Sequence, residues 1–101
     1  MGKTCTELFA GIDCTILGNA DDEVNGIAYR SDRVQPGDAF FCVVGMTTDG
    51  HSFAQDAIDR GAKVLVVERK VYLADATDVT EIVAKDTRKA MAAAAANFFF
   101  S

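Results

Sequence analysis

The chain has 101 residues, half of them apolar, and a formal net charge of −5. This length suits one domain with its own core and leaves no room for a second. The ten lysines and arginines are scattered among 15 acidic residues, which excludes a basic nucleic-acid-binding surface, and no apolar run is long enough for a membrane span. We therefore expect neither nucleic acid nor a membrane as a partner.

Three cysteines, Cys5, Cys14 and Cys42, lie far apart in the chain, and there is one histidine. An odd number of cysteines without a C-x-x-C pair predicts reduced thiols and no metal site. The first residues also lack the apolar core of a signal peptide. The sequence therefore predicts a cytoplasmic protein.

The first third of the chain predicts one short helix and two strands. Thr4 and Glu7 have the spacing of a capping box, and Gly11 is suited to end the helix that follows. A short strand is expected over 13–18, before a turn-rich segment. Alternating side chains predict a second strand over 24–31.

The middle of the chain predicts a tight turn, a buried strand and a helix. Pro36 and Gly37 suit the second and third positions of a type II turn. The run over 39–44 is continuously apolar, which is typical of a strand buried on both faces. Ser52 and Gln55 have the spacing of a second capping box, so we expect a helix to begin there.

The remaining elements complete the predicted fold. Gly61 is suited to end the helix, and strands are expected over 62–68 and 79–85. Asp86 or Thr87 can cap a last helix, whose alanine run has high helix propensity. The β–α–β order predicts the α/β class, with a small mixed, partly parallel sheet of about five strands flanked by two to three helices.

Three consecutive aromatic residues, Phe98–Phe100, come near the end of the last helix. They point in three directions around a helix, so not all can face one core. An exposed aromatic cluster is typical of an interface, and a buried helix end is the alternative. We interpret the chain as part of a longer protein in which this helix leads to another domain.

The segment Gly45–Ser52 has the spacing of a phosphate-binding P-loop, G-x-x-x-x-G-K-[ST], with His51 in place of the lysine. It follows a predicted buried strand and precedes a predicted helix, which is the context such a loop requires. Backbone N–H groups at the helix start, the helix dipole and the hydroxyls of Thr47 and Thr48 would all favour an anion.

Two features argue against ATP at this loop. Without the lysine no cation reaches the outer phosphates, and Asp49 places a negative charge in the cradle. Asp49 can instead brace the loop by accepting backbone N–H bonds, and a structural role is the simpler interpretation of His51. The residues alone leave an anion-accepting loop and a plain structural turn open.

Three segments together resemble the N-terminal domain of the Mur ligases. The first two lie within the resembling stretch 26–68: residues 29–41 read YRSDRVQPGDAFF, and residues 45–53 read GMTTDGHSF. The third, 85–99, reads KDTRKAMAAAAANFF and is similar to the segment before the ATPase domain in the ligases that add the third peptide residue. The resemblance covers the chain from about Leu8 to Phe99.

The resemblance implies that residues 1–101 form a UDP-sugar-binding domain without catalytic residues. Its ligand would be the UDP end of UDP-N-acetylmuramoyl-L-alanyl-D-glutamate. A central ATPase domain of the same parent chain, which this sequence lacks, would bind ATP and Mg²⁺, and a third domain would present the incoming amino acid. This segment alone holds no cofactor and is expected to be inactive.

Carried over by position, the resemblance implies two groups of site residues. Those expected to contact the UDP moiety are Tyr29, Ser31, Met46, Thr47 and Thr48. Those expected to support the loop are Gly45, Asp49, Gly50 and His51.

One departure from the family pattern concerns the charges beside Ser31. The family has Asp-Ser-Arg where this chain has Arg30-Ser31-Asp32. A salt bridge between the two flanking residues survives this exchange, whereas a specific contact by the family's arginine does not. Ser31 as a turn-capping residue and Tyr29 as a core aromatic are the structural alternatives.

Three other functions remain open from the sequence. The related ligase that adds D-alanyl-D-alanine shares the Pro-Gly-Asp and Asp-Gly-His segments. A non-enzymatic interaction module would dock a partner through Phe98–Phe100. A degenerate P-loop kinase fragment would bind ATP in a Mg²⁺-dependent manner.

Overall fold

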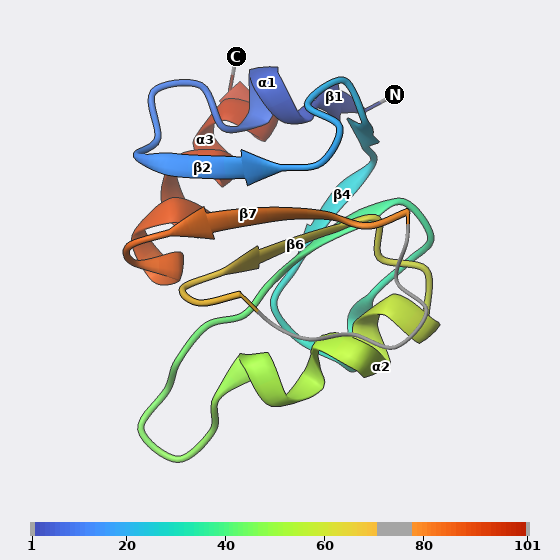
Figure 1. Cartoon of the computed structure of the whole chain (residues 1–101), viewed down its shortest axis with the longest axis vertical. Helices are drawn as coiled ribbons and strands as arrows, with labels where there is room; N and C mark the ends of the chain where they lie inside the picture. The colour runs from blue at the N-terminus through green and yellow to red at the C-terminus, as the bar shows by residue number, and fades with distance from the viewer. Residues whose placement is uncertain (1, 71–77, 101) are drawn as a thin grey trace.

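The computed structural model describes residues 2–70 and 78–100, and its centre is a five-stranded sheet (Figure 1). The strand order is β2-β7-β6-β5-β4. The strands are β2 (Cys14–Leu17), β7 (Thr80–Ala84), β6 (Val64–Val67), β5 (Asp38–Phe41) and β4 (Gly26–Ala28). The four strands from β7 to β4 are parallel, and β2 pairs antiparallel with β7. The predicted mixed, partly parallel sheet is confirmed.

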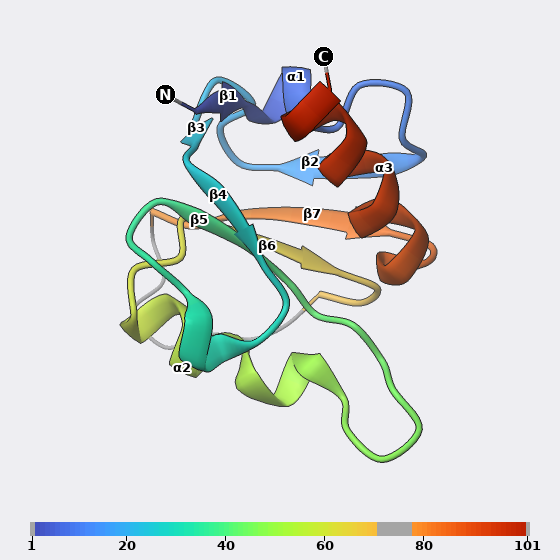
Figure 2. The same ribbon diagram turned by 180° about the vertical axis from the view of Figure 1, so that it is seen from behind.

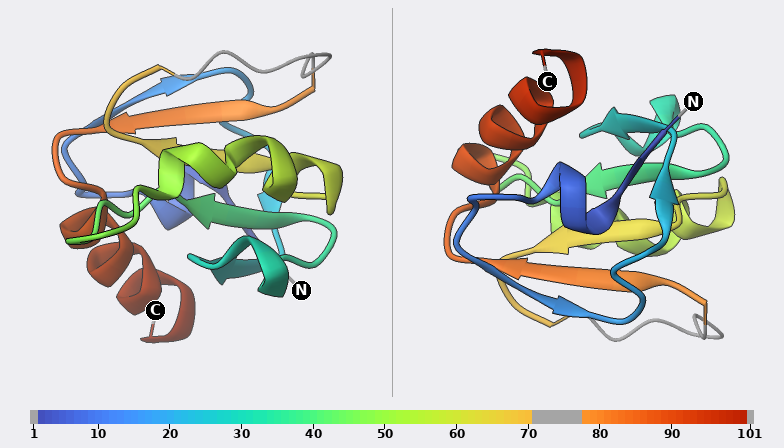
Figure 3. Two further views of the ribbon diagram at one scale, coloured as in Figure 1. Left: turned by 90° about the horizontal axis from the view of Figure 1, so that it is seen from below. Right: turned by 90° about the horizontal axis from the view of Figure 1, so that it is seen from above.

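Helices cover both faces of this sheet. Figure 3 shows α2 across one face and both α1 and α3 on the opposite face. The helices are α1 (Cys5–Leu8), α2 (Ala54–Asp59) and α3 (Thr87–Phe100), with the 3-10 turns η1 (Ser31–Arg33) and η2 (Gly50–Phe53). A separate two-stranded ladder joins β1 (Lys3–Thr4) to β3 (Glu23–Val24). The edge strands of the main sheet are β2 and β4, and β4 lies toward the viewer in Figure 2.

Alternating side chains of the central strands divide the core into two parts. Phe41, Val66 and Ile82 face α1 and α3, whereas Phe40 and Leu65 face α2. All five are fully buried. This explains the continuously apolar runs in the sequence, because a strand covered on both faces needs apolar side chains at every position.

Local signals at the ends of elements are largely confirmed. The Thr4 hydroxyl and the Glu7 carboxylate form the reciprocal capping box. Gly37 has a φ of 87°, and the Asp38 amide donates to the Gln35 carbonyl, which closes the predicted turn. At the end of α2, Gly61 has a φ of 107°, a left-handed conformation that suits glycine.

The start of the last helix also follows its sequence signal. The Asp86 carboxylate accepts the amides of Arg88 and Lys89 at 3.0 and 3.1 Å. Asp86 is therefore the N-cap. Thr87, the other candidate, is instead fully buried inside the first turn.

Two predicted boundaries are wrong. Ser52 does not cap a helix: its amide donates to the Asp49 carbonyl, and α2 begins at Ala54 without a side-chain cap. The Asp49 carboxylate takes the cap position first and starts η2 ahead of α2. The strand expected over 24–31 is also interrupted, because Glu23–Val24 pairs with β1 and residues 31–33 turn into η1.

The long helix α3 is tied to α1 at the opposite end of the chain. The Asn97 side-chain amide donates to the carbonyls of Leu8 and Ala10 at 2.9 and 3.1 Å. Of the three aromatic residues near the end of α3, Phe98 packs on the core, whereas Phe99 and Phe100 are 66% and 87% exposed. The expectation that not all three face one core is confirmed.

Candidate functional site

A cleft of about 470 Å³ opens where the parallel strands β4 and β5 end. The carboxyl ends of parallel strands are where open α/β sheets usually place their ligands. One wall is formed by the segment that follows β4, and the other by the loop and 3-10 turn that follow β5. The cleft is lined by Tyr29, Arg30, Ser31, Asp32, Val43, Gly45, Thr48, Gly50 and Phe53.

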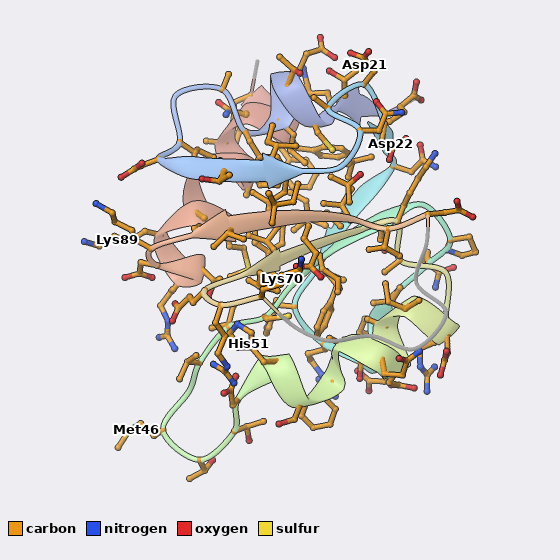
Figure 4. All side chains as sticks on the ribbon, viewed as in Figure 1. Asp21, Asp22, Met46, His51, Lys70 and Lys89 are labelled. Carbon is orange, nitrogen blue, oxygen red and sulfur yellow. The ribbon has the colours of Figure 1, made fainter. Side chains whose placement is uncertain are left out.

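The loop between β5 and η2 is a narrow hairpin with an open tip. The Gly45 amide donates to the Thr48 carbonyl at 2.7 Å, and the Gly50 amide donates to the Val43 carbonyl at 2.9 Å. Figure 4 shows Met46 pointing outward at the tip, where its side chain is fully exposed. Among the described residues, no acceptor meets the amides of 46, 47 and 48.

The base of the same loop is densely bonded around Asp49. One carboxylate oxygen, Oδ1, accepts the backbone amide of His51 at 2.9 Å and lies 2.6 Å from the His51 ring atom Nδ1. The other oxygen, Oδ2, accepts from the Arg69 guanidinium at 2.9 Å. The Arg69 bond and then the His51 amide hold the pKa of Asp49 well below its usual range.

His51 (labelled in Figure 4) is buried at the loop base, and its ring has a partner at each nitrogen. The backbone amide of Glu68 donates to Nε2 of the ring at 3.0 Å. A nitrogen that accepts a hydrogen bond carries no proton, so the neutral ring has its proton on Nδ1 and donates it to Asp49. Both ring nitrogens are therefore occupied within the protein.

These bonds change the interpretation of the P-loop-like spacing. The amides of His51 and Ser52 at the start of η2 are taken by the side chain and the carbonyl of Asp49. The expectation of free N–H groups at the helix start is therefore wrong. The open backbone donors lie instead at the loop tip, over 46–48.

The network continues from the loop to the start of α3. The Glu68 carboxylate accepts the Thr87 amide at 2.9 Å. The Thr87 hydroxyl lies 2.8 Å from the Cys42 carbonyl oxygen and 3.1 Å from Glu68 Oε2. In addition, the Arg88 guanidinium donates to the Val44 carbonyl at 3.1 Å, where the loop begins.

The other wall of the cleft carries the exchanged charges. Arg30 and Asp32 form a salt bridge of 3.0 Å, so the pairing expected to survive the exchange is present. A hydrogen bond from the Ser31 hydroxyl is the largest of the effects that lower the pKa of Asp56 in α2. Tyr29 is 60% exposed, which excludes the alternative of a core aromatic.

The predicted site residues thus occupy three places. Five of them line the cleft: Tyr29, Ser31, Gly45, Thr48 and Gly50. Met46 and Thr47 form the exposed tip, outside the cleft lining. Asp49 and His51 lie behind the loop and hold its base.

The sequence did not point to Val43 and Phe53 as cleft residues. Val43 lies two residues after the end of β5, and Phe53 ends η2 with 43% of its surface exposed. Phe53 could have been found from its place in the first turn after the loop, where an exposed aromatic ring faces the same opening as the loop glycines.

Within 2–70 and 78–100, no group of three potential ligating side chains could hold a metal ion. No helix among the described residues is long and apolar enough to cross a bilayer. All three cysteines are free thiols.

Comparison with known sequences links this fold and cleft to one group of enzymes. The family model described as "Mur ligase family, catalytic domain" matches residues 23–99. A UDP-N-acetylmuramoyl-L-alanyl-D-glutamate–2,6-diaminopimelate ligase of Clostridium perfringens is 43% identical over 93 residues, which is 91% of this chain and 19% of that protein. UDP-N-acetylmuramyl-tripeptide synthetase 2 of Oceanobacillus iheyensis is 37% identical over 83 residues, 82% of this chain and 17% of that protein.

Comparison with solved structures gives the same group. The UDP-N-acetylmuramoylalanyl-D-glutamyl-2,6-diaminopimelate–D-alanyl-D-alanyl ligase of Acinetobacter baumannii superposes with a TM-score of 0.76 and 26% identity. The match covers 96% of this chain and 21% of that structure. The chain therefore spans about a fifth of the length of the proteins it matches.

Proposed function

Because the chain belongs to the Mur ligase family, we propose that it is the N-terminal, UDP-binding part of an ATP-dependent ligase of peptidoglycan synthesis. The parent enzyme would add the third amino acid to UDP-N-acetylmuramoyl-L-alanyl-D-glutamate in the cytoplasm. Relatives named as diaminopimelate ligases and as a tripeptide synthetase support this choice of substrate. Residues 1–101 would form one domain of that enzyme.

The observation that carries the proposal is the cleft itself. It brings Tyr29 and Ser31 from one wall together with Gly45 and Thr48 from the other. An exposed tyrosine ring suits stacking on uracil, which is worth on the order of 1 kcal/mol. The open amides over 46–48 are suited to a pyrophosphate, as in other backbone anion sites.

The same residues do not fit ATP and Mg²⁺. The position of the P-loop lysine is occupied by His51, whose two ring nitrogens are already bonded. The Asp49 carboxylate lies where a phosphate would need donors. We therefore assign no step of the ligase reaction to this chain and expect the isolated domain to show no ATP turnover.

A second candidate is the N-terminal domain of the ligase that adds D-alanyl-D-alanine. It is favoured by the superposition on the Acinetobacter baumannii enzyme. The 43% identity to the diaminopimelate ligase exceeds the 26% identity to that enzyme, and this supports the first candidate. Both candidates share the UDP group as ligand.

The test is a titration of the ¹⁵N-labelled domain with UDP, followed by NMR. We expect saturable shifts at Ser31, Gly45 and Thr48, with a dissociation constant of about 1 mM because only part of the substrate site is present. Ser31→Ala and Thr48→Val should weaken binding, whereas Thr15→Val on β2 should not. Saturable shifts confined to another surface would contradict the proposal.

A matched titration with the nucleotide dipeptide and with ATP completes the test. UDP-N-acetylmuramoyl-L-alanyl-D-glutamate should shift the same amide signals as UDP and bind with equal or higher affinity. ATP with Mg²⁺ should give chemical-shift changes no larger than those of UDP. No response to any nucleotide would favour the alternative of an interaction module that docks through the exposed rings of Phe99 and Phe100.

A further inference from the structure

The ring of His51 is the only imidazole in the chain, and it links the cleft loop to the end of β6. It is 6% exposed. On one side it lies 2.6 Å from the Asp49 carboxylate, and on the other it accepts the Glu68 amide at 3.0 Å. A ring bonded at both nitrogens has one orientation and one tautomer.

The Asp49 carboxylate is fixed from several directions. It accepts from the His51 amide, the His51 ring and the Arg69 guanidinium, so neither oxygen is left without a donor. Charge-assisted hydrogen bonds of this kind are stronger than neutral ones. The backbone at Asp49, from which the loop tip departs, is therefore held in place.

The loop tip has little support of its own. Over 45–48 its internal hydrogen bond is the one from the Gly45 amide to the Thr48 carbonyl. Its direction must then be set where it joins the fold: at Val44, held by Arg88, and at Asp49, held by His51. The amides at 46–48 will point toward a ligand only while both ends stay in place.

We infer that His51 is a positioning residue: by donating from Nδ1 to Asp49 while Nε2 holds the Glu68 amide, it sets the orientation of the loop that receives the pyrophosphate. This inference rests on the proposed function, since it concerns the same cleft. His51 does not touch the ligand. It stands where a P-loop has its lysine but acts on the loop from behind.

The test compares three substitutions of His51 in the UDP titration. In His51→Asn the side-chain amide keeps a donor near Asp49, whereas His51→Gln reaches toward the Glu68 amide and His51→Ala keeps neither bond. We expect His51→Ala to weaken UDP binding about tenfold, the effect of losing roughly one hydrogen bond's free energy. His51→Gln should weaken it nearly as much, and His51→Asn should restore most of the affinity.

Loss of stability must be separated from loss of positioning. Ile82→Val removes one methylene-sized group from the core on the face of α1 and α3, away from the cleft, and serves as a control that is also less stable. Binding is measured at a temperature where the melting curve of each variant shows it fully folded. The control should bind UDP like the wild type.

A spectroscopic measurement addresses the tautomer directly. Because there is one histidine, long-range ¹H–¹⁵N spectra of the ring need no assignment by mutation. We expect a protonated Nδ1 and an unprotonated Nε2, and a change at Nδ1 when Asp49→Asn is introduced. A ring protonated at Nε2 would overturn the inference.

Two binding outcomes remain distinguishable. If the wild type binds UDP and His51→Ala binds it equally well, the inference fails while the proposed function stands. If the wild type shows no binding, the proposed function fails and the inference fails with it.

Discussion

The tip and the base of one loop differ sharply in this protein. At the tip, Met46 is fully exposed and the amides of 46–48 have no acceptor among the described residues. At the base, Asp49 and His51 share bonds with each other, with Arg69 and with Glu68. The comparison shows that two halves of an eight-residue motif can differ in structure: the tip keeps free backbone donors, and the base is closed within the fold.

This division explains why the P-loop spacing is misleading here. In a P-loop the backbone amides at the helix start face the phosphate. In this chain the Asp49 carboxylate accepts the His51 amide and the Asp49 carbonyl accepts the Ser52 amide. An internal anion has taken the place of an external one. Any external anion must then use the tip, and substitutions in the two halves should have different effects.

The largest expected loss of stability comes from Gly50, where the loop base packs on the backbone of Cys42 and Val43, just after β5. A Cβ atom there would lie 2.7 Å from the Val43 amide nitrogen, which is too close for any side chain. Gly50→Ala should lower the free energy of unfolding by about 2–3 kcal/mol, as overpacking of a rigid site does. Urea denaturation measures this change.

Gly45 provides the matched control near the tip. The nearest atom to a Cβ there is the Thr48 carbonyl oxygen at 3.3 Å, a contact that a small loop movement relieves. Gly45→Ala should therefore cost far less than Gly50→Ala. Equal losses at the two glycines would mean that tip and base are equally rigid.

The next largest loss of stability is expected at Thr87, which links the loop base to the start of α3. Thr87→Val keeps the shape but removes the hydroxyl that donates to the Cys42 carbonyl at a fully buried site. We expect a loss of about 1–2 kcal/mol, because a buried acceptor is left unpaired. The same change at exposed Thr15 in β2 should leave the urea midpoint unchanged, and a comparable loss there would refute the explanation.

Asp49 makes the stability of the loop base depend on pH. Its pKa is held below the ordinary value of about 3.9 by Arg69 and by the His51 amide. A carboxyl group whose pKa is lower in the folded than in the unfolded state stabilises the fold fully at pH values above its unfolded-state pKa. This stabilisation is lost as the pH falls through the folded-state pKa. Asp49→Asn should therefore cost at most about 1 kcal/mol near neutral pH, since the pair with Arg69 is partly exposed and screened.

Urea denaturation of the wild type and Asp49→Asn over a series of pH values tests whether the carboxylate charge causes the loss of stability. The stability difference between the wild type and Asp49→Asn should narrow steadily as the pH is lowered below about 4. A difference that stays constant from neutral to acid pH would show that the carboxylate charge is not responsible. Added salt should also reduce the difference.

The smallest changes in stability and in UDP affinity are expected at the loop tip. Met46→Ala and Thr47→Ala remove side chains that are exposed and lie outside the cleft lining, so stability should change by less than about 0.5 kcal/mol. Because the tip amides remain, UDP affinity should also change little. A large loss of affinity in either variant would show that these side chains contact the ligand directly.

Local chemistry accounts for most of what the sequence predicted correctly. The capping box at Thr4, the turn at Pro36-Gly37 and the cap at Asp86 each depend on residues within a few positions of one another. The buried strands follow from their apolar runs alone. These features need no knowledge of the rest of the fold.

The errors arose where distant residues decide between local alternatives. Asp49 and Ser52 are both good capping residues, and Asp49 prevails with support from Arg69, which lies 20 positions later in the chain. The link from Glu68 to Thr87 likewise joins residues 19 positions apart. A single sequence does not show which of these pairs will meet.

The bonds from Asn97 to Leu8 and Ala10 have a consequence for how the molecule opens. A helix of four residues such as α1 has almost no tendency to persist by itself, because its nucleation is unfavourable. One side chain from the far end of the sequence closes over its last turn. The first and last helices should therefore exchange their amide protons with solvent in concert, as one cooperative unit, although 89 positions separate Leu8 from Asn97.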